Sequence, residues 1–316
     1  MISPGTELAL LNGTHVGFSD PEISWARYPI EPGYAAVGEV VESASDSGPE
    51  PGRSVLYYGP HAEFGVLQPD KMVWTAVPEP LDSGRSIFRY LPVRFAQIAL
   101  TAVLARAWES RHVLVYGAGI VGNLCAQLFT HVSGVEAAGV VDPLDSRRSI
   151  AGECGLTSTL SPDEVASWVR DTTGGAGPDT IVEATGVPRV VAESVERVAP
   201  RGQVLLLGST RGTVELNAYK HIHRKLVALI GSHESLLPER GTGDHLRFVS
   251  DVPQWLRAVS RQEALEHLVA AVSSGTIRTE PFVQEVISTG AVRDAYMELR
   301  DHPNEHLGMV IDWHDS

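Results

Sequence analysis

A short glycine-rich stretch in the middle of the chain most constrains what the chain can fold into. An apolar run of strand type at 113–116 is followed by three glycines, and residues 120–128 then carry apolar side chains at helical spacing. The first glycine permits a tight turn, the second lets a pyrophosphate approach the backbone, and the third lets helix and strand pack closely. The helix start presents free N–H groups to phosphates. The stretch therefore predicts a dinucleotide site formed by Gly117, Gly119, Ile120, Val121 and Gly122.

Asp142 indicates which dinucleotide is bound. It ends the apolar run 137–141 and lies 20 residues beyond Gly122 (142 − 122 = 20), the spacing at which a carboxylate meets the adenosine ribose. A carboxylate repels a 2′-phosphate, so NAD is expected in preference to NADP. Arg147 and Arg148 follow, and either reach towards a phosphate or lie exposed on the next helix. A strand-to-helix turn without any ligand is the remaining alternative.

Composition limits the class of protein. A chain of 316 residues is too long for one ordinary core, so two domains are expected. The net charge of −14 argues against a nucleic-acid partner. We expect no membrane span, because no apolar run reaches the roughly 20 residues required, and no signal peptide opens the chain. A cytoplasmic location is expected. The two cysteines, Cys125 and Cys154, are too few for a disulfide framework.

The chain order predicts three regions. Residues 1–95 are rich in Gly and Pro with short strand-like runs, and indicate an irregular β-rich domain. Residues 96–235 alternate strands with helices, and the strands are apolar on both faces, which predicts a doubly wound parallel α/β sheet. Residues 236–316 hold helices near 261–274 and 290–300, and then a strand, 309–312, that is expected to rejoin the first domain. The polar loop 238–246 has no clear assignment.

A series of motifs in the expected order resembles the medium-chain dehydrogenase/reductase superfamily, relatives of the zinc alcohol dehydrogenases. The resemblance implies a Rossmann domain beside a GroES-like β-rich catalytic domain that is shortened at its N-terminus. It also implies a homodimer formed by sheet extension near 226–231. The motifs, which span nearly the whole chain, are 4–7, 32–40, 51–55, 61–64, 100–102, 117–122, 183–186 and 202–208.

The metal ligands of the zinc members are replaced in this chain. Those members carry Cys, His and Glu at the positions occupied here by Pro4, Tyr34 and Ala35. Catalytic zinc needs three protein ligands, which proline and alanine cannot supply. No cysteine occurs in the first 124 residues, so the family's four-cysteine lobe is missing as well. A zinc-free member with no metal site is therefore expected. His221 and His223 have a spacing that suits a metal, but beside two basic residues they more often form a solvated edge.

Three short segments are most similar to the zinc-free branch typified by hydroxyethyl bacteriochlorophyllide dehydrogenase. They are 3–7, 32–34 and 309–313. The likeness points to pigment biosynthesis or secondary metabolism without fixing a substrate. Superfamily members also have β structure before the segment that matches 4–7. Either the start codon is misplaced or the first hairpin is lost, in which case an opened β edge would invite pairing with another subunit.

The resemblance also assigns site residues. Tyr34 takes the place of a metal-binding histidine and is the first candidate acid/base, with a packing tyrosine as the alternative. Thr6 lies where a proton-relay hydroxyl is found, with a turn-stabilising hydroxyl as the alternative. His61 is a possible proton shuttle or a solvated loop histidine. The residues expected beside the nicotinamide are Thr101, Gly208 and Ser209, and Thr185 and Gly186 are also expected to bind the cofactor.

Three functions follow as hypotheses. The leading one is a zinc-independent oxidoreductase that moves a hydride between NAD(H) and a small-molecule alcohol or ketone. The second is an enoyl or quinone reductase, which the carboxylate of Asp142 disfavours because such members usually prefer NADPH. The third is a dinucleotide-binding protein without turnover.

Overall fold

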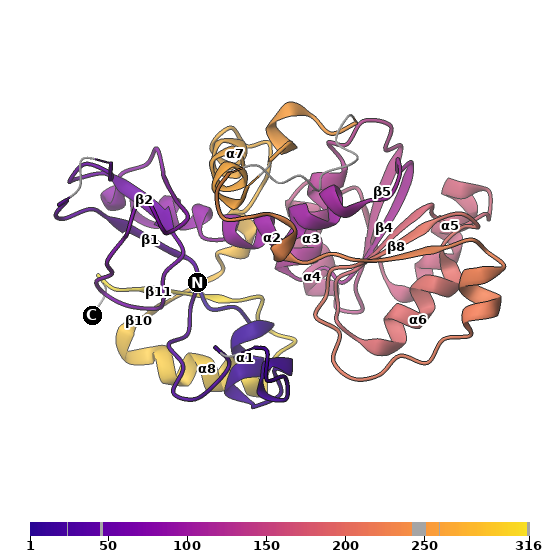
Figure 1. Cartoon of the computed structure of the whole chain (residues 1–316), viewed down its shortest axis with the longest axis horizontal. Coiled ribbons are helices and arrows are strands. Elements are labelled where there is room, and N and C mark those ends of the chain that lie inside the picture. Colours follow the sequence, from indigo (N-terminus) through magenta and orange to yellow (C-terminus); the bar gives the residue numbers. More distant parts are fainter. Residues whose placement is uncertain (24, 45–46, 242–250, 259, 315–316) are drawn as a thin grey trace. The chain divides into compact units, whose positions relative to one another are not determined.

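The structure is a computed structural model that describes residues 1–316 apart from 24, 45–46, 242–250, 259 and 315–316 (Figure 1). The chain forms two compact units. Unit 1 comprises Met1–Arg94 together with Thr279–Ser316, and unit 2 comprises Phe95–Arg278.

Unit 2 contains a six-stranded parallel sheet in the order β6-β5-β4-β7-β8-β9. The order reverses beside β4, and at such a point the carboxyl ends of parallel strands open a crevice for a ligand. This confirms the predicted doubly wound α/β fold. The strands are β4 (His112–Tyr116), β5 (Ala137–Val141), β6 (Ser158–Leu160), β7 (Thr180–Glu183), β8 (Gln203–Leu206) and β9 (Ala228–Gly231).

Helices cover both faces of this sheet, with α3 and α4 on one side and α5 and α6 on the other (Figure 1). On the second side Trp168 packs with Leu114 and Ile181 in a buried apolar cluster. Gly139 makes room for Trp168, since a Cβ there would lie 3.2 Å from its ring. The helices of unit 2 are α2 (Val93–Ala105, whose first two residues belong to unit 1), α3 (Ile120–Phe129), α4 (Asp145–Glu153), α5 (Val165–Thr173), α6 (Pro188–Arg197) and α7 (Arg261–Ser273).

Unit 1 combines two small sheets with two helices. An antiparallel sheet has the order β1-β2-β3, and β10 pairs with β11 in parallel. Ile2, Leu8 and Leu299 are buried together in a cluster that joins the start of the chain to its C-terminal part. The elements are α1 (Thr6–Leu11), β1 (Ala36–Glu39), β2 (Ser54–Tyr57), β3 (Trp74–Ala76), β10 (Glu285–Ser288), α8 (Val292–Asp301) and β11 (Met309–Asp312).

The structure corrects two sequence-based expectations about organisation. The expected boundary at 235 differs from the observed one, because residues up to Arg278 belong to unit 2 and only those from Thr279 return to unit 1. Side chains hold the segment in unit 2: Gln127 donates to the Arg278 carbonyl (3.0 Å) and accepts from its N–H (2.9 Å). The helix α1 was not expected within the β-rich region. Part of the unassigned loop 238–246, namely 242–246, lies outside the described residues.

One helical stretch of the described chain, Gly84–Ala105, is apolar enough by length and composition to cross a membrane, with a mean hydropathy of 1.3. The sequence predicts no membrane span here, because three arginines interrupt the apolar stretch. Since 83% of its most apolar part is buried inside the protein, it is accounted for as a core helix.

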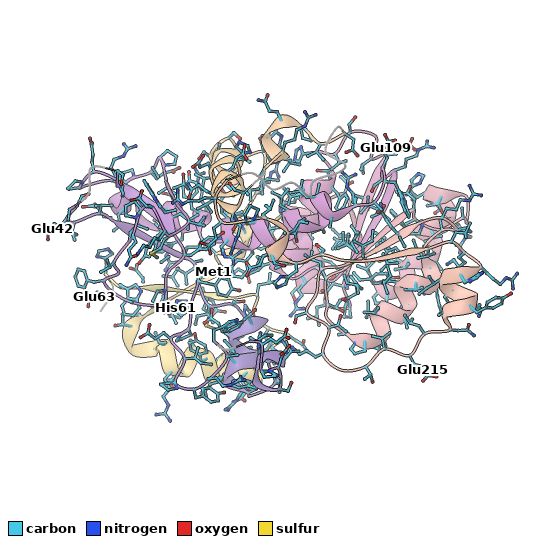
Figure 2. All side chains as sticks on the ribbon, in the orientation of Figure 1. Met1, Glu42, His61, Glu63, Glu109 and Glu215 are labelled. Carbon is cyan, nitrogen blue, oxygen red and sulfur yellow. The ribbon has the colours of Figure 1, made fainter. Side chains whose placement is uncertain are left out.

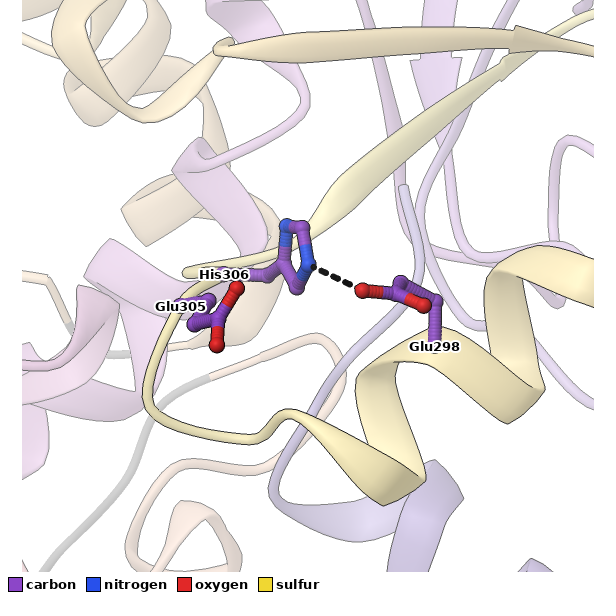
Figure 3. A group of neighbouring side chains, drawn as sticks. All are labelled: Glu298, Glu305 and His306. Atoms are coloured by element: carbon purple, nitrogen blue, oxygen red, sulfur yellow. Dashed lines mark hydrogen bonds and ion pairs between the residues drawn. The ribbon is translucent and has the colours of Figure 1, made fainter.

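His306, just before β11, links three segments of unit 1 (Figure 3). Its Nδ1 lies 2.5 Å from Glu285 of β10 and its Nε2 lies 3.3 Å from Glu298 of α8. The carboxylate of Glu305 lies close to the same ring, so that three glutamates surround His306. Burial alone lowers the pKa of His306, but the hydrogen bonds to the two glutamates outweigh burial, so its pKa is raised.

We expect this histidine to make stability depend on pH. A raised folded-state pKa contributes stability that is fully present below the unfolded value of about 6.5, and that is lost as pH rises through the folded value. His306→Asn should therefore lower the urea midpoint more at pH 5.5 than at pH 9. His314→Asn, at an exposed histidine, is the control. An equal loss at both pH values would contradict the expectation.

Candidate active site

The glycine turn after β4 has the geometry that the motif predicts. Gly117 has φ +97°, which favours glycine, and its N–H donates to the Val141 carbonyl (2.7 Å). A Cβ on Gly122 would lie 1.9 Å from the Gly117 carbonyl oxygen, so only glycine lets α3 pack this closely. Gly119 begins α3 as its N-cap, and a Cβ there would meet nothing within 4 Å. The turn thus leaves open space in front of the free N–H groups of a helix, which fits a pyrophosphate.

Asp142 lies beside this turn, as expected from its spacing, but its carboxylate is directed into the protein. Oδ2 accepts from the Ala118 N–H and Oδ1 from the Leu144 N–H, both at 2.9 Å, and the residue is 2% exposed. Asp142 therefore fixes the glycine turn to the end of β5. Each carboxylate oxygen keeps a second lone pair, so acceptance from a ribose hydroxyl remains chemically open.

The two arginines that follow have different surroundings. Arg148 is held by the Asp142 carbonyl (2.7 Å) and by Asp145 (3.0 Å). Arg147 is partly buried and reaches only 3.8 Å from the Asp142 carboxylate. Of the two, Arg147 is the cation nearer to the carboxylate that is expected to meet the ribose.

The turns after β7 and β8 join the same region. A Cβ on Gly117 would meet the Thr185 methyl at 3.0 Å, and one on Gly186 would meet the Ser209 carbonyl oxygen at 2.6 Å. Gly208 is equally close, since its Cβ would lie 2.4 Å from the Gly186 N. The structure therefore brings the predicted cofactor residues of these turns together at the carboxyl ends of β4, β7 and β8.

Glu183, which the motif contained without an assigned role, organises these turns. It is fully buried, and its carboxylate accepts from the N–H groups of Thr185 (2.7 Å) and Gly186 (3.0 Å). Its backbone carbonyl accepts from the Gly208 N–H (2.7 Å).

Thr101 differs from the expectation of a residue open to the nicotinamide. It is 1% exposed, and its hydroxyl bonds to the Ile98 carbonyl (2.6 Å) and to the Ser232 hydroxyl (2.9 Å). In this structure Thr101 ties α2 to the residue that follows β9.

In unit 1, one buried carboxylate connects the candidate catalytic residues. Glu7 is 3% exposed and accepts from the Ser3 N–H (2.8 Å), from the Tyr296 hydroxyl of α8, and from His61 Nε2 (3.0 Å). Figure 2 shows His61 within unit 1, whereas Glu63 of the same loop is exposed. His61 is thus a partnered side chain, and the solvated alternative is wrong.

The glycine in the motif 32–34 is required for steric reasons. Gly33 has φ +99°, and a Cβ there would lie 2.6 Å from the His61 N and 2.8 Å from its Nδ1. The His61 N–H donates to the Pro32 carbonyl (2.9 Å). Glycine at 33 therefore allows the histidine loop to lie against the segment that carries Tyr34.

Tyr34 lies at the centre of a hydroxyl group cluster. Its phenol donates to Ser3 Oγ at 2.7 Å, and Thr6 also hydrogen-bonds to it. Burial raises the pKa of Tyr34 to about 12. The hydrogen bond with Ser3 lowers this pKa, the Glu7 carboxylate raises it, and Arg94 and Thr6 lower it. Tyr34 therefore keeps its proton at neutral pH, so it can act as an acid but not as a base.

Within the part of the chain that the structure describes, the one group of three candidate metal ligands is the Glu298, Glu305 and His306 cluster of Figure 3, and two of these are exposed glutamates. His221 is buried 3.5 Å from Glu196, whereas His223 is exposed, so this pair does not converge on one point.

Unit 1 also holds a cavity of about 830 Å³. It runs beside β1 and β2, the loop 60–67 and the tail 311–314, and His61 contributes to its wall. Tyr34 and Ser3 are not among its lining residues, whereas Ala35, next to Tyr34 in sequence, is.

Sequence reasoning missed four residues of the site. They are Ser3, Glu7, Arg94 and Tyr296. Glu7 stood inside a recognised motif, and its acidic side chain next to a threonine was the available signal. Tyr296 is far away in the sequence, so no local pattern marks it.

The two motif glycines allow a matched test. Gly122→Ala places a Cβ against backbone, so we expect a loss of about 1–3 kcal/mol in the free energy of unfolding. Gly119→Ala has room in the fold, so stability should be kept, while affinity for a dinucleotide should fall because the methyl group enters the phosphate space. Urea unfolding and cofactor titration measure the two effects. Equal cofactor affinity in Gly119→Ala and the unmodified protein would contradict the predicted phosphate position.

Sequence comparison gives the relatives of the chain. The family model described as zinc-binding dehydrogenase matches residues 121–248. L-threonine 3-dehydrogenase of Pyrococcus horikoshii is 32% identical over 42% of this chain and 38% of its own length, so the match spans well under half of that relative. 2-Desacetyl-2-hydroxyethyl bacteriochlorophyllide A dehydrogenase of Rhodobacter capsulatus is 29% identical over 100% of this chain and 88% of its own length.

Solved structures share the fold. An alcohol dehydrogenase of Thermotoga maritima has a TM-score of 0.70 at 18% identity, covering 97% of this chain and 88% of its own. An Escherichia coli CFT073 alcohol dehydrogenase complexed with NADH has a TM-score of 0.55 at 19% identity, covering 82% and 69%. A zinc-binding dehydrogenase of Sinorhizobium meliloti bound to NADP has a TM-score of 0.64 at 21% identity, covering 92% and 84%.

The family match, the relative aligned over the whole chain and the doubly wound sheet with its glycine turn agree with one another. The chain is therefore similar in sequence to zinc-binding dehydrogenases over residues 121–248 and shares its fold with alcohol dehydrogenases.

Proposed function

We propose that this protein is a zinc-independent oxidoreductase that uses NAD(H) to interconvert a small-molecule ketone and alcohol. The observation that carries the proposal is the hydroxyl cluster of Tyr34, Ser3 and Thr6, in which Tyr34 takes, by resemblance, the position of a metal-binding histidine of the zinc relatives. Proline at 4 and alanine at 35 offer no metal ligand. Hydrogen-bond donors must then stabilise the developing oxyanion.

The cofactor half of the proposal rests on the turns of unit 2. The space before Gly119 suits a pyrophosphate, and the Asp142 carboxylate disfavours a 2′-phosphate. When bound, a reduced nicotinamide supplies a hydride. NADP remains the second choice, supported by Arg147 at 3.8 Å from Asp142 and by the NADP-bound structural neighbour.

Tyr34 has the proton-donor role in this scheme. Because burial raises its pKa to about 12, Tyr34 is a protonated phenol at neutral pH, which is the form that ketone reduction requires of a proton donor. As the carbonyl carbon accepts the hydride, its oxygen gains negative charge and takes the Tyr34 proton. Solvent returns that proton, so that ketone, NADH and one proton give alcohol and NAD⁺.

The two alternatives differ in measurable ways. An enoyl or quinone reductase would oxidise NADPH with conjugated alkenes or quinones, and a binding protein would hold NADH without turnover. The Tyr34 cluster favours carbonyl chemistry, because a proton donor at oxygen is what that reaction requires.

We also propose a homodimer formed through β9. Among the described strands β9 pairs with β8 alone, which leaves its other edge open. Leu226 is 60% exposed and Leu229 38% exposed beside that edge. Open strand edges with apolar side chains favour pairing with another chain.

The first prediction concerns the cofactor. Titration of metal-assayed protein with NADH and NADPH should give a dissociation constant at least tenfold lower for NADH, about 1.4 kcal/mol. The physical reason is repulsion between the Asp142 carboxylate and a 2′-phosphate. Stoichiometric zinc in the protein would contradict zinc independence, and tighter NADPH binding would contradict the role given to Asp142.

The second prediction concerns Tyr34. Tyr34→Phe should lower kcat for ketone reduction by about 10²- to 10⁴-fold, the usual value of a general acid, with NADH affinity unchanged. Tyr28→Phe, at an exposed tyrosine of the same unit, is the matched control. Full activity in Tyr34→Phe across a carbonyl panel would exclude Tyr34 as the acid.

The third prediction concerns assembly. The protein should have twice its chain mass of 34.0 kDa by light scattering, and Leu229→Arg should make it a monomer. Val66→Lys, at an exposed apolar residue of unit 1, should leave the dimer intact. A dimer that persists in Leu229→Arg would show that β9 is not the contact.

A further inference from the structure

Arg94 is a buried cation beside the candidate acid. It is the second residue of α2 and is 5% exposed. Its guanidinium carbon lies 5.3 Å from the centre of the Tyr34 ring and 4.3 Å from the centre of the Tyr58 ring. Arg94 therefore places a positive charge against the rings of two tyrosines in the interior of unit 1.

Two buried groups of opposite charge act on Tyr34. The Glu7 carboxylate raises the pKa of the phenol, and the Arg94 guanidinium lowers it. Glu7 accepts hydrogen bonds from three donors, among them His61 and Tyr296, which hold the carboxylate in place. Among the described groups that act on Tyr34, Arg94 is the one whose positive charge favours a negative phenol oxygen.

We propose that Arg94 is the positioning residue of Tyr34, a fixed positive charge that performs the electrostatic work for which zinc relatives use a metal ion. The inference deepens the proposed function and rests on it for the identity of the reaction. The guanidinium of Arg94 lies 5.3 Å from the centre of the Tyr34 ring, and a cation over an aromatic face is attracted to the ring and holds it in place.

The charge of Arg94 matters most when Tyr34 gives up its proton. The substrate oxygen and the phenol oxygen then share one negative charge in a site away from solvent, where a fixed cation stabilises it more strongly than in water. A metal ion would act on the substrate oxygen directly. Arg94 acts through the tyrosine, so its removal should alter the proton transfer and leave cofactor binding unaffected.

The alternative is that Arg94 only packs between the two rings. Charge and shape can be separated by substitution: Arg94→Met keeps a long apolar side chain without the charge, and Arg94→Lys keeps the charge without the planar group. The chain also offers a matched control. Arg89 of unit 1 lies 5.2 Å from the ring of Tyr90, so Arg89→Met removes a cation from a different tyrosine.

The test that does not depend on activity is the titration of Tyr34 itself. The full chain is labelled with 3,5-difluorotyrosine, whose fluorines bring phenol ionisation into a range the fold tolerates, and the Tyr34 fluorine signal is identified by its loss in Tyr34→Phe. Arg94→Met should move the Tyr34 titration up by about one pH unit, a tenfold change in proton affinity. Arg94→Lys should stay within half a unit, and Arg89→Met should have no effect.

Several outcomes would overturn the inference. One is an unchanged Tyr34 titration in folded Arg94→Met, and another is an equal shift in Arg89→Met. If Arg94→Met does not fold, Arg94→Lys decides, because a shift of a full unit with the charge retained would mean that packing dominates.

Steady-state kinetics test whether Arg94 affects the reaction through Tyr34. With a ketone found in the panel, Arg94→Met should lower kcat by about 100-fold with KM little changed, and it should have no further effect in a Tyr34→Phe background. Additive losses in the double variant would contradict action through Tyr34. Absence of any NADH oxidation would instead count against the proposed function, while the fluorine titration still decides the role of Arg94.

Discussion

The candidate site of unit 1 depends on one interaction, the burial of the Glu7 carboxylate among three donors. It joins the beginning of the chain at Ser3 to the loop at His61 and to α8 at Tyr296. A carboxylate in this position is stable only while its donors are in place, since an unpaired buried charge is costly. The hydrogen bonds that Glu7 accepts thus also fix the N-terminal segment, which carries Ser3 and Thr6, the partners of Tyr34.

Unit 2 also contains buried carboxylates that are held by hydrogen-bond donors. Asp142 and Glu183 are buried carboxylates at the ends of β5 and β7, the strands on either side of β4, and each accepts N–H groups of the turn beside it. Hydrogen bonds to charged acceptors are stronger than those between neutral groups, so they hold irregular turns in one conformation. A rigid turn keeps its phosphate-facing N–H groups in position before any ligand arrives. Across both units, buried carboxylates hold the loops that bear the proposed chemistry.

The cluster around Tyr34 is the part of the molecule most specific to this chain. Burial and Glu7 favour the protonated phenol, while Arg94, Ser3 and Thr6 favour its ionisation. A group under such opposing influences can hold a proton at rest and release it when a neighbouring oxygen becomes basic. Tyrosine, proline and alanine stand where, by resemblance, zinc relatives carry metal ligands, and in the proposed function hydrogen-bond donors and a fixed cation surround the candidate acid instead.

The sequence alone determined the doubly wound sheet and its glycine turn, because these depend on local hydrophobic periodicity and on conformations that only glycine adopts easily. It also gave Tyr34, Thr6 and His61, through motifs whose order along the chain resembles a superfamily. Only the tertiary structure decided that His61 is held by Glu7, that Thr101 is used internally, and that 236–278 belongs to unit 2. Arg94 and Tyr296 likewise emerged only there. Contacts between residues far apart in sequence leave no periodic signal, because the burial that creates them exists only after the chain has folded.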